Sequence, residues 1–470
     1  MGKATGFLEY GRKENPFRDA AERLHDYADL HVAQGTEERR CQASRCMNCG
    51  VPFCQSSFGC PLHNLIPEWN DLLWRGEERE ALERLTETAP FPEFTGRVCP
   101  ALCEKACNLA DEGVTNRDNE LYLIEKGFAE GWVRPRPPRE RTGKRAAVVG
   151  SGPSGLAAAD LLNRLGHSVT VFERADRAGG LLTYGIPNMK LPKDIVARRI
   201  RLMEEEGVTF RLNTEATAEA LEEFDAVILC GGARKPRALN VDHTDAEGVR
   251  FAVAFLTETT GKLLAGEDCN LAKGLHVLVI GGGDTGNDCV GTVLRQGCAS
   301  VTQLEMMPAP PESRGAGNPW PEWPRTLRTD YGQLEAISVQ GGDPRIYETT
   351  VKRILTDEKN HITGVETVKL RRTPEGKMEP IPGSEQTLAC GLMLIAAGFV
   401  GCDGKTLENF SLTADGRGRL MPEDSSHYLG GNLFSAGDMR TGQSLVVRAL
   451  ADGRAAALEA DVLLRKTVLS

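Results

Sequence analysis

The chain has 470 residues, which at roughly 150 residues per domain leaves room for about three domains and a sizeable core. Acidic residues outnumber basic ones, 66 to 56, and the net charge of −10 argues against nucleic acid or an anionic membrane as the main partner. No apolar run approaches the about 18 to 20 residues that a membrane span needs, and no signal-peptide core is found near the N-terminus. We therefore expect a cytoplasmic protein that binds neither membrane nor nucleic acid.

The first part of the chain, residues 1–140, differs chemically from the rest. Its amphipathic stretches at 19–32 and 66–85 are separated by loops rich in Cys, Pro and Gly, which predicts a helical, loop-rich domain. The charged and proline-rich stretch 133–143 has no periodicity and is typical of a connector.

Cysteines are concentrated in this region, and without an export signal they indicate metal or redox chemistry rather than disulfides. Seven thiols, one fewer than two four-ligand sites need, show close spacing: Cys46, Cys49, Cys54, Cys60, Cys99, Cys103 and Cys107. By count alone, zinc and iron–sulfur clusters fit such sites equally well, and free or disulfide-bonded thiols are a third possibility. The redox nucleotide sites that follow favour iron–sulfur clusters, because zinc carries no electrons.

A βαβ unit follows the connector, with strands predicted at 145–149 and 168–172 and a helix at 156–165. A glycine-rich loop lies between strand and helix and is typical of a dinucleotide site; its residues are Gly150, Gly152, Pro153, Ser154 and Gly155. Glu173 ends the second strand, where a carboxylate can accept hydrogen bonds from a ribose. The expected FAD contacts are completed by Arg174, Gly180 and Leu181.

The pattern recurs with strands predicted at 276–280 and 300–304 and a helix at 284–295. The second glycine-rich loop is expected to bind NAD(P)H through Gly281, Gly283, Asp284, Thr285 and Gly286. Glu305 closes the unit and favours the free 2′-hydroxyl of NADH, unless it is only a solvated strand end. Arg314 could offset its charge and admit NADPH, so the choice of nucleotide stays open.

The C-terminal part predicts antiparallel strands at 343–373, a buried strand at 391–397 and a long helix at 445–464. Between the last two, Gly437 and Asp438 end an apolar stretch, and the Asp438 carboxylate is placed to bind the ribityl chain of a flavin. A helix beginning at Gln443 and Ser444 is expected to direct its positive end at the flavin ring.

These elements predict an α/β fold in which a helical iron–sulfur domain precedes two Rossmann-like domains of the flavin disulfide reductase type. The expected divisions are a helical domain at 1–140, an FAD-binding domain at 141–270 and 386–470, and an NAD(P)H-binding domain at 271–385. The cofactors provide the redox chemistry, so we expect no catalytic acid or base among the side chains.

The sequence resembles the small (β) subunits of glutamate synthase, within a larger family that includes the N-terminal part of dihydropyrimidine dehydrogenase. The resemblance covers nearly the whole chain and rests on the segments 46–54, 64–70, 91–100, 184–187 and 318–324 and on the Gly-Asp pair. It implies two [4Fe-4S] clusters. One would be held by Cys46, Cys49, Cys54 and Cys107, and the other by Cys60, Cys99, Cys103 and Glu120, with Glu125 as the alternative to Glu120.

The resemblance also implies an electron-input function. NAD(P)H would be oxidised by FAD, and electrons would pass through the clusters to a large (α) subunit that carries FMN and makes L-glutamate from L-glutamine and 2-oxoglutarate. A hetero-oligomer is therefore expected. The alternatives are a subunit of an electron-bifurcating NADH-dependent ferredoxin:NADP oxidoreductase, a stand-alone NAD(P)H-dependent reductase, and a zinc-stabilised scaffold fused to an inactive flavoprotein.

Overall fold

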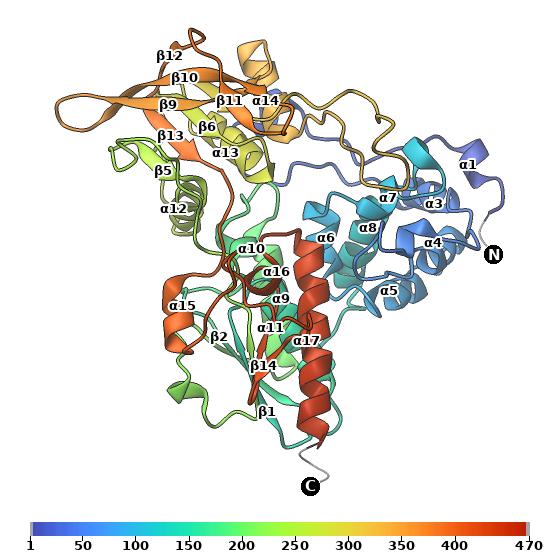
Figure 1. Cartoon of the computed structure of the whole chain (residues 1–470). Coiled ribbons are helices and arrows are strands. Elements are labelled where there is room, and N and C mark those ends of the chain that lie inside the picture. The colour runs from blue at the N-terminus through green and yellow to red at the C-terminus, as the bar shows by residue number, and fades with distance from the viewer. Residues whose placement is uncertain (1–2, 467–470) are drawn as a thin grey trace.

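The computed structural model describes residues 3–466 and divides them into a helical module and two parallel-sheet units (Figure 1). The helical module surrounds a core that includes Trp69, Leu73 and Leu85, all fully buried. Its helices are α1 (Gly6–Glu9), α2 (Ala20–Arg23), α3 (Thr36–Ser44), α4 (Ile66–Arg75), α5 (Glu78–Thr86), α6 (Pro92–Val98), α7 (Leu102–Lys105) and α8 (Asn116–Ala129), with the 3-10 turns η1 (Phe53–Gln55) and η2 (Ala110–Glu112). The predicted helical domain is confirmed.

One predicted segment of this module is wrong. The stretch 19–32 is helical only over α2, and the chain after it continues in turns and bends, with the Arg18 amide donating a backbone hydrogen bond to Leu30. Tertiary contacts override its amphipathic pattern, because the Arg23 guanidinium is buried and donates to the Glu335 carboxylate at 2.6 Å, far along the chain.

The first sheet has the strand order β14-β15-β4-β1-β2-β3 and is parallel except at β14. Its strands are β1 (Arg145–Val149), β2 (Ser168–Phe172), β3 (Thr209–Arg211), β4 (Ala226–Leu229), β14 (Tyr428–Gly430) and β15 (Leu433–Ser435). The helices of this unit are α9 (Pro153–Arg164), α10 (Leu181–Tyr184), α11 (Lys193–Glu205), α15 (Gly404–Asn409), α16 (Asp438–Thr441) and α17 (Val446–Lys466), with η3 (Glu219–Leu221). α17 runs beside α9 and brings the C-terminal segment against the first glycine-rich loop (Figure 1).

The second sheet is parallel, with the order β5-β13-β6-β7-β8. Its strands are β5 (Val249–Phe251), β6 (His276–Ile280), β7 (Ser300–Leu304), β8 (Arg345–Ile346) and β13 (Leu392–Ile395), and its helices are α12 (Ala252–Leu264), α13 (Asp284–Arg295) and α14 (Tyr331–Gln340). The antiparallel strands β9 (Thr349–Thr356), β10 (Ile362–Arg372), β11 (Met378–Pro380) and β12 (Gln386–Ala389) form a separate sheet beside it.

The strand pairing corrects the expected division of the chain. β5 lies before the expected boundary at 270, and β13 lies after the expected boundary at 385, yet both pair within the second sheet. A short apolar parallel strand has the same sequence pattern in either sheet, so hydrophobic periodicity could not assign these two. In the described part of the chain, no helix has both the length and the apolar composition needed to cross a membrane.

Candidate cofactor sites

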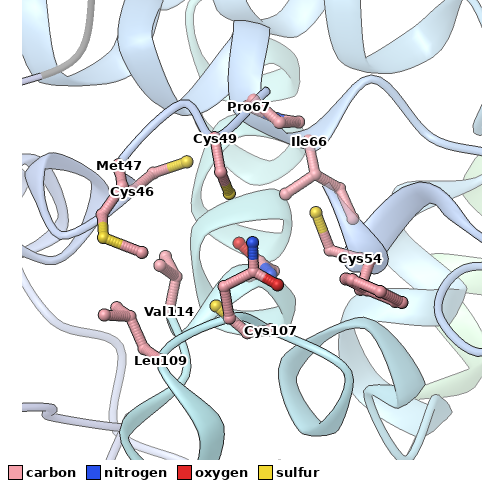
Figure 2. A pocket seen from close by; sticks show the side chains of 12 residues that line it. Cys46, Met47, Cys49, Cys54, Ile66, Pro67, Cys107, Leu109 and Val114 are labelled. Atoms are coloured by element: carbon pink, nitrogen blue, oxygen red, sulfur yellow. The ribbon is translucent and has the colours of Figure 1, made fainter. Parts of the chain in front are cut away.

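Four predicted cluster ligands line one cavity of the helical module, which we call the outer cavity. Cys46 follows α3, Cys49 lies in the next loop, Cys54 lies in η1 and Cys107 follows α7. Figure 2 shows their side chains arranged around a common space. Burial raises the pKa of the Cys46 thiol to about 12, so a bound cation is needed to hold it as a thiolate at neutral pH.

The other predicted ligands line a second cavity, which we call the inner cavity. Cys60, Cys99, Cys103 and Glu120 share its wall with Arg117 and Val447. Burial raises the pKa of Glu120 to about 8. The alternative ligand Glu125 is not part of this wall and instead pairs with Arg97 and Arg198, each at 2.9 Å.

The donor sets of both cavities fit iron–sulfur clusters. Among residues 3–466, no three Cys, His, Asp or Glu side chains converge where a single metal ion would sit; the thiols instead surround two open spaces. Soft thiolates spaced around a cavity are what a polynuclear cluster needs. Cys41, which sequence spacing sets apart, does not line either cavity.

The first glycine-rich loop joins β1 to α9 as predicted and is braced by Glu173. This carboxylate accepts hydrogen bonds from the Ser151 amide at 3.0 Å, the Ser151 hydroxyl at 2.5 Å and the Ala175 amide at 2.9 Å. Gly180 approaches so closely that a Cβ there would lie 2.9 Å from the Cα of Gly152. A loop this bare of side chains can receive the pyrophosphate of FAD on the α9 N-terminus, which Pro153 begins.

The C-terminal Gly-Asp pair packs on the same loop. Gly437 has φ of 71°, and a Cβ there would lie 2.4 Å from the Ser154 hydroxyl, itself next to Gly155. Burial raises the pKa of Asp438 to about 6, and the Ser444 hydroxyl donates to its carboxylate at 2.8 Å. These groups lie where a flavin would be held, so the residues present fit FAD.

Three details of the predicted FAD contacts differ. The long helix begins at Val446 rather than Gln443, because the Gln443 side chain accepts a hydrogen bond from the Phe399 amide at 2.6 Å. The Arg174 guanidinium lies 3.4 Å from the Asp403 carboxylate. Leu181 begins α10, and its side chain is exposed.

The second glycine-rich loop joins β6 to α13 and is braced in the same way by Glu305. Its carboxylate accepts from the Gly282 amide at 2.8 Å and from the Met307 amide at 2.9 Å. A Cβ at Gly281 would lie 2.4 Å from the Ala396 carbonyl oxygen, and one at Gly286 would lie 2.3 Å from the Gly281 carbonyl oxygen. The remaining predicted residues are exposed or half-buried around the α13 N-terminus: Gly283, Asp284 and Thr285.

The Arg314 guanidinium donates to the Glu322 carbonyl at 2.7 Å, within its own segment of the chain. A second arginine, Arg328, was missed by the sequence analysis. The charges of Asp284 and Arg314 both act on the pKa of Arg328, so this residue lies near the nucleotide loop. Its guanidinium stacks on Trp323, 3.8 Å from the ring centre. Its position 23 residues beyond Glu305 gave no spacing signal.

The sequence analysis also missed a polar contact between the two nucleotide-binding units. The Lys190 ammonium, from the first unit, lies 3.0 Å from the Asp288 carboxylate on α13, which accepts a further hydrogen bond from the Tyr331 hydroxyl at 2.9 Å. No motif marks these residues in the sequence. They fix how the NAD(P)H-binding unit faces the FAD-binding unit.

Comparisons with known proteins match two parts of the chain to known domain families. Residues 23–132 match the family of dihydropyrimidine dehydrogenase domain II with a 4Fe-4S cluster, and residues 148–205 match the NAD(P)-binding Rossmann-like domain. The structure resembles FprA, a Mycobacterium tuberculosis oxidoreductase, with a TM-score of 0.52 at 18% identity, over 71% of this chain and 86% of that one. This last similarity concerns the fold.

Several relatives that match over nearly their whole length carry the same name. The chain is 47% identical to the "Glutamate synthase [NADPH] small chain" of Bacillus subtilis, covering 98% of both chains. It is 34% identical to the protein of that name in Escherichia coli, covering 96% of this chain and 97% of that one. It is also 44% identical to "Glutamate synthase [NADH]" of Schizosaccharomyces pombe, where 98% of this chain spans only 23% of the longer protein.

Fold, cavities and glycine-rich loops together define an oxidoreductase that uses NAD(P)H, FAD and [4Fe-4S] clusters. Its domain order places cluster-binding cysteines before two dinucleotide-binding units. The chain belongs to the family of glutamate synthase small chains.

Proposed function

We propose that this chain is the electron-input subunit of a glutamate synthase and works with a large subunit that carries FMN. When bound, FAD accepts a hydride from NAD(P)H and the [4Fe-4S] clusters carry single electrons onward. The large subunit would use these electrons to make L-glutamate from L-glutamine and 2-oxoglutarate. The small-chain names of the relatives support this partnership.

The observation that carries the proposal is the order of the sites. Val447, at the start of α17 and three residues after Ser444, lines the inner cavity together with the cysteines. Ile66 lines both cavities, so the inner cavity lies between the FAD-binding unit and the outer cavity. This arrangement suits the transfer of electrons from the flavin toward the surface of the helical module.

In this proposal, the side chains of the protein bind the cofactors, orient the two nucleotide-binding units and shield the clusters from water. The two braced loops would hold the dinucleotides on helix N-termini, and the Lys190–Asp288 pair would orient one unit against the other. In the proposed ligand sets, Cys46, Cys49, Cys54 and Cys107 hold the outer cluster and Cys60, Cys99, Cys103 and Glu120 hold the inner one.

The test combines the intact chain, with FAD and clusters, and a glutamate synthase large chain. We expect NAD(P)H-dependent glutamate formation that Cys107→Ser abolishes, while reduction of ferricyanide by NAD(P)H at the flavin persists. A wild-type chain that reduces ferricyanide but never supports glutamate formation would overturn the proposal. Gentle isolation from the native source separates the alternatives, because a partner resembling ferredoxin–NADP reductase would indicate electron bifurcation and no partner would indicate a stand-alone reductase.

A further inference from the structure

A loop of the NAD(P)H-binding unit reaches the outer cavity. It comprises residues 306–330, between β7 and α14, and contains neither helix nor strand. Figure 1 shows it extending from α14 toward α7, the helix that precedes Cys107. At its far end, the indole N–H of Trp320 donates a hydrogen bond to the backbone carbonyl of Cys107 at 3.0 Å.

The same indole also contacts the loop that carries Cys54. Its ring centre lies 4.8 Å from that of Phe53, in an edge-on arrangement at 60°. Phe53 lines the outer cavity and directly precedes Cys54. Trp320 therefore touches two separate cysteine-bearing segments, while about a third of its own surface (36%) remains exposed.

The loop is organised so as to present this tryptophan. Asn318 is buried, donates to the Trp323 carbonyl at 3.0 Å and accepts from the Arg325 amide at 2.7 Å. Arg314 donates to the Glu322 carbonyl on the same turn. These bonds restrict the backbone on both sides of Trp320, so the indole is held in place instead of sampling many positions.

We propose that Trp320 is a positioning residue for the outer cluster, supplied by the NAD(P)H-binding unit. It fixes the Cys107 segment through its hydrogen bond and covers the Phe53 side of the cavity against water. Groups that orient metal ligands commonly change metal affinity 10- to 100-fold when removed, and exposure to solvent shifts cluster potentials. The inference rests on the proposed ligand set of the outer cavity.

The test uses the full chain, purified without oxygen and carrying FAD and clusters. Trp320→Ala removes the hydrogen bond and the cover, whereas Trp320→Phe removes only the hydrogen bond. Trp323→Phe is the matched control, because Trp323 belongs to the same loop but stacks on Arg328. The readouts are iron release to bipyridine from the reduced protein and the electron paramagnetic resonance (EPR) signal of the outer cluster, which is identified as the signal missing from Cys107→Ser.

We expect iron to leave the outer cluster about tenfold faster in Trp320→Ala than in wild type, with a smaller increase in Trp320→Phe and none in Trp323→Phe. The outer EPR signal should change in both Trp320 variants, and the inner signal and FAD content should not. Unchanged iron release and EPR in the Trp320 variants would overturn the inference. If Trp320→Ala does not fold, Trp320→Phe decides through its EPR signal.

These outcomes are separable from failure of the proposed function. The iron and EPR readouts need no large subunit, so a chain that never supports glutamate synthesis can still show the effect of Trp320. Conversely, normal glutamate synthesis with unaltered clusters in both Trp320 variants would leave the proposed function intact and remove only this role of Trp320.

Discussion

The two nucleotide-binding units share one plan and differ in how the rest of the chain surrounds their loops. In both, a glutamate at the end of the second strand binds an amide of the glycine-rich loop. Around the first loop, Ser151 and Ser154 are buried under segments from far along the chain. Around the second loop, residues 282–284 are exposed.

The difference matches two kinds of ligand. The first loop is closed in by the segments that carry Gly180, Gly437 and Gly453. Such a loop suits a cofactor that stays bound, since its release would require several contacts to separate. An open loop suits a nucleotide that must enter and leave in each catalytic cycle. The surroundings of a Rossmann loop, more than its glycine pattern, therefore distinguish the site for resident FAD from the site for exchanging NAD(P)H.

The largest expected effect comes from the last glycine of each loop. In Gly155→Ala the new Cβ would lie 2.0 Å from the Gly150 carbonyl oxygen, and in Gly286→Ala it would lie 2.3 Å from that of Gly281. Overpacking of this kind costs about 1–3 kcal/mol, which corresponds to an affinity loss of about 5- to 150-fold. We expect Gly155→Ala to lose FAD on gel filtration, and Gly286→Ala to keep FAD but show a raised KM for NAD(P)H.

Each of these variants is the control for the other, since the same methyl group is added to the same motif. Loss of FAD from Gly286→Ala would show that the two units depend on each other, and it would contradict the distinction between the closed first loop and the open second loop.

A narrower effect, on nucleotide binding but not on FAD retention, is expected at the glutamate that braces the open loop. Glu305→Ser removes the acceptor of the Gly282 and Met307 amides, and with it the carboxylate that we expect to accept from a ribose hydroxyl. A lost hydrogen bond to a charged group costs about 1.5–3 kcal/mol, so the KM for NADH should rise at least about tenfold. The KM for NADPH should rise less, because a 2′-phosphate no longer meets a carboxylate. Steady-state kinetics with both nucleotides measures this.

The matched control is Glu312→Ser, which changes an exposed carboxylate in the loop that follows Glu305. Equal increases for NADH and NADPH in Glu305→Ser would mean that this carboxylate only shapes the loop and does not select the nucleotide.

The sequence predicted what is local and missed what depends on distant pairing. The glycine loops, their strands and the cysteine groups follow from spacing, and the geometry brings Glu120, given by resemblance, to the inner cavity. The expected domain boundaries misplaced β5 and β13, because strands of three or four residues do not encode which strands they pair with. Only Ala20–Arg23 of the predicted helix at 19–32 is helical, and Arg23 is bound to a partner more than 300 residues away.

Trp320 shows the same limit within a site. The segment 318–324 was noticed for its resemblance, and its two tryptophans among prolines were a signal of a structured loop. Nothing in the spacing connected this loop with Cys107, more than 200 residues earlier, because the contact exists only once the second sheet is placed against the helical module.

The packing of α17 on the closed loop gives a third prediction, in stability. In Gly453→Ala the new Cβ would lie 2.1 Å from the Ser154 carbonyl oxygen, so α17 must move away from α9. We expect a loss of about 1–3 kcal/mol in the free energy of unfolding, with weaker retention of FAD.

Gly261→Ala is the control: it lies inside α12 with open space around its Cβ position, and alanine there should stabilise the protein by about 0.5–1 kcal/mol. Urea unfolding followed by circular dichroism compares the two, and equal effects would argue against tight packing at Gly453.

The smallest effect concerns the pH dependence of the closed loop. His427 lies 3.1 Å from Asp452 and 2.7 Å from Glu459, and Asp452 also accepts from the Gly437 amide at 2.7 Å and pairs with Arg440. Burial lowers the pKa of His427, but the two carboxylates outweigh burial and Arg440, so the pKa is raised above its ordinary value of 6.5. Because the folded protein holds this proton more tightly than the unfolded chain, the contribution to stability is full below pH 6.5 and is lost as pH rises through the folded pKa.

Thermal unfolding followed by flavin fluorescence should therefore show a fall in Tm between pH 6 and pH 8 that is smaller in His427→Asn, which cannot titrate. His276→Asn is the control, because His276 is exposed and bonds to the Ser300 hydroxyl instead of a carboxylate. If wild type and His427→Asn lose Tm equally over this range, the network from His427 to Gly437 does not support the closed loop through charge. The closure would then rest on packing alone, namely on the contacts of Gly437 and Gly453 with Ser154.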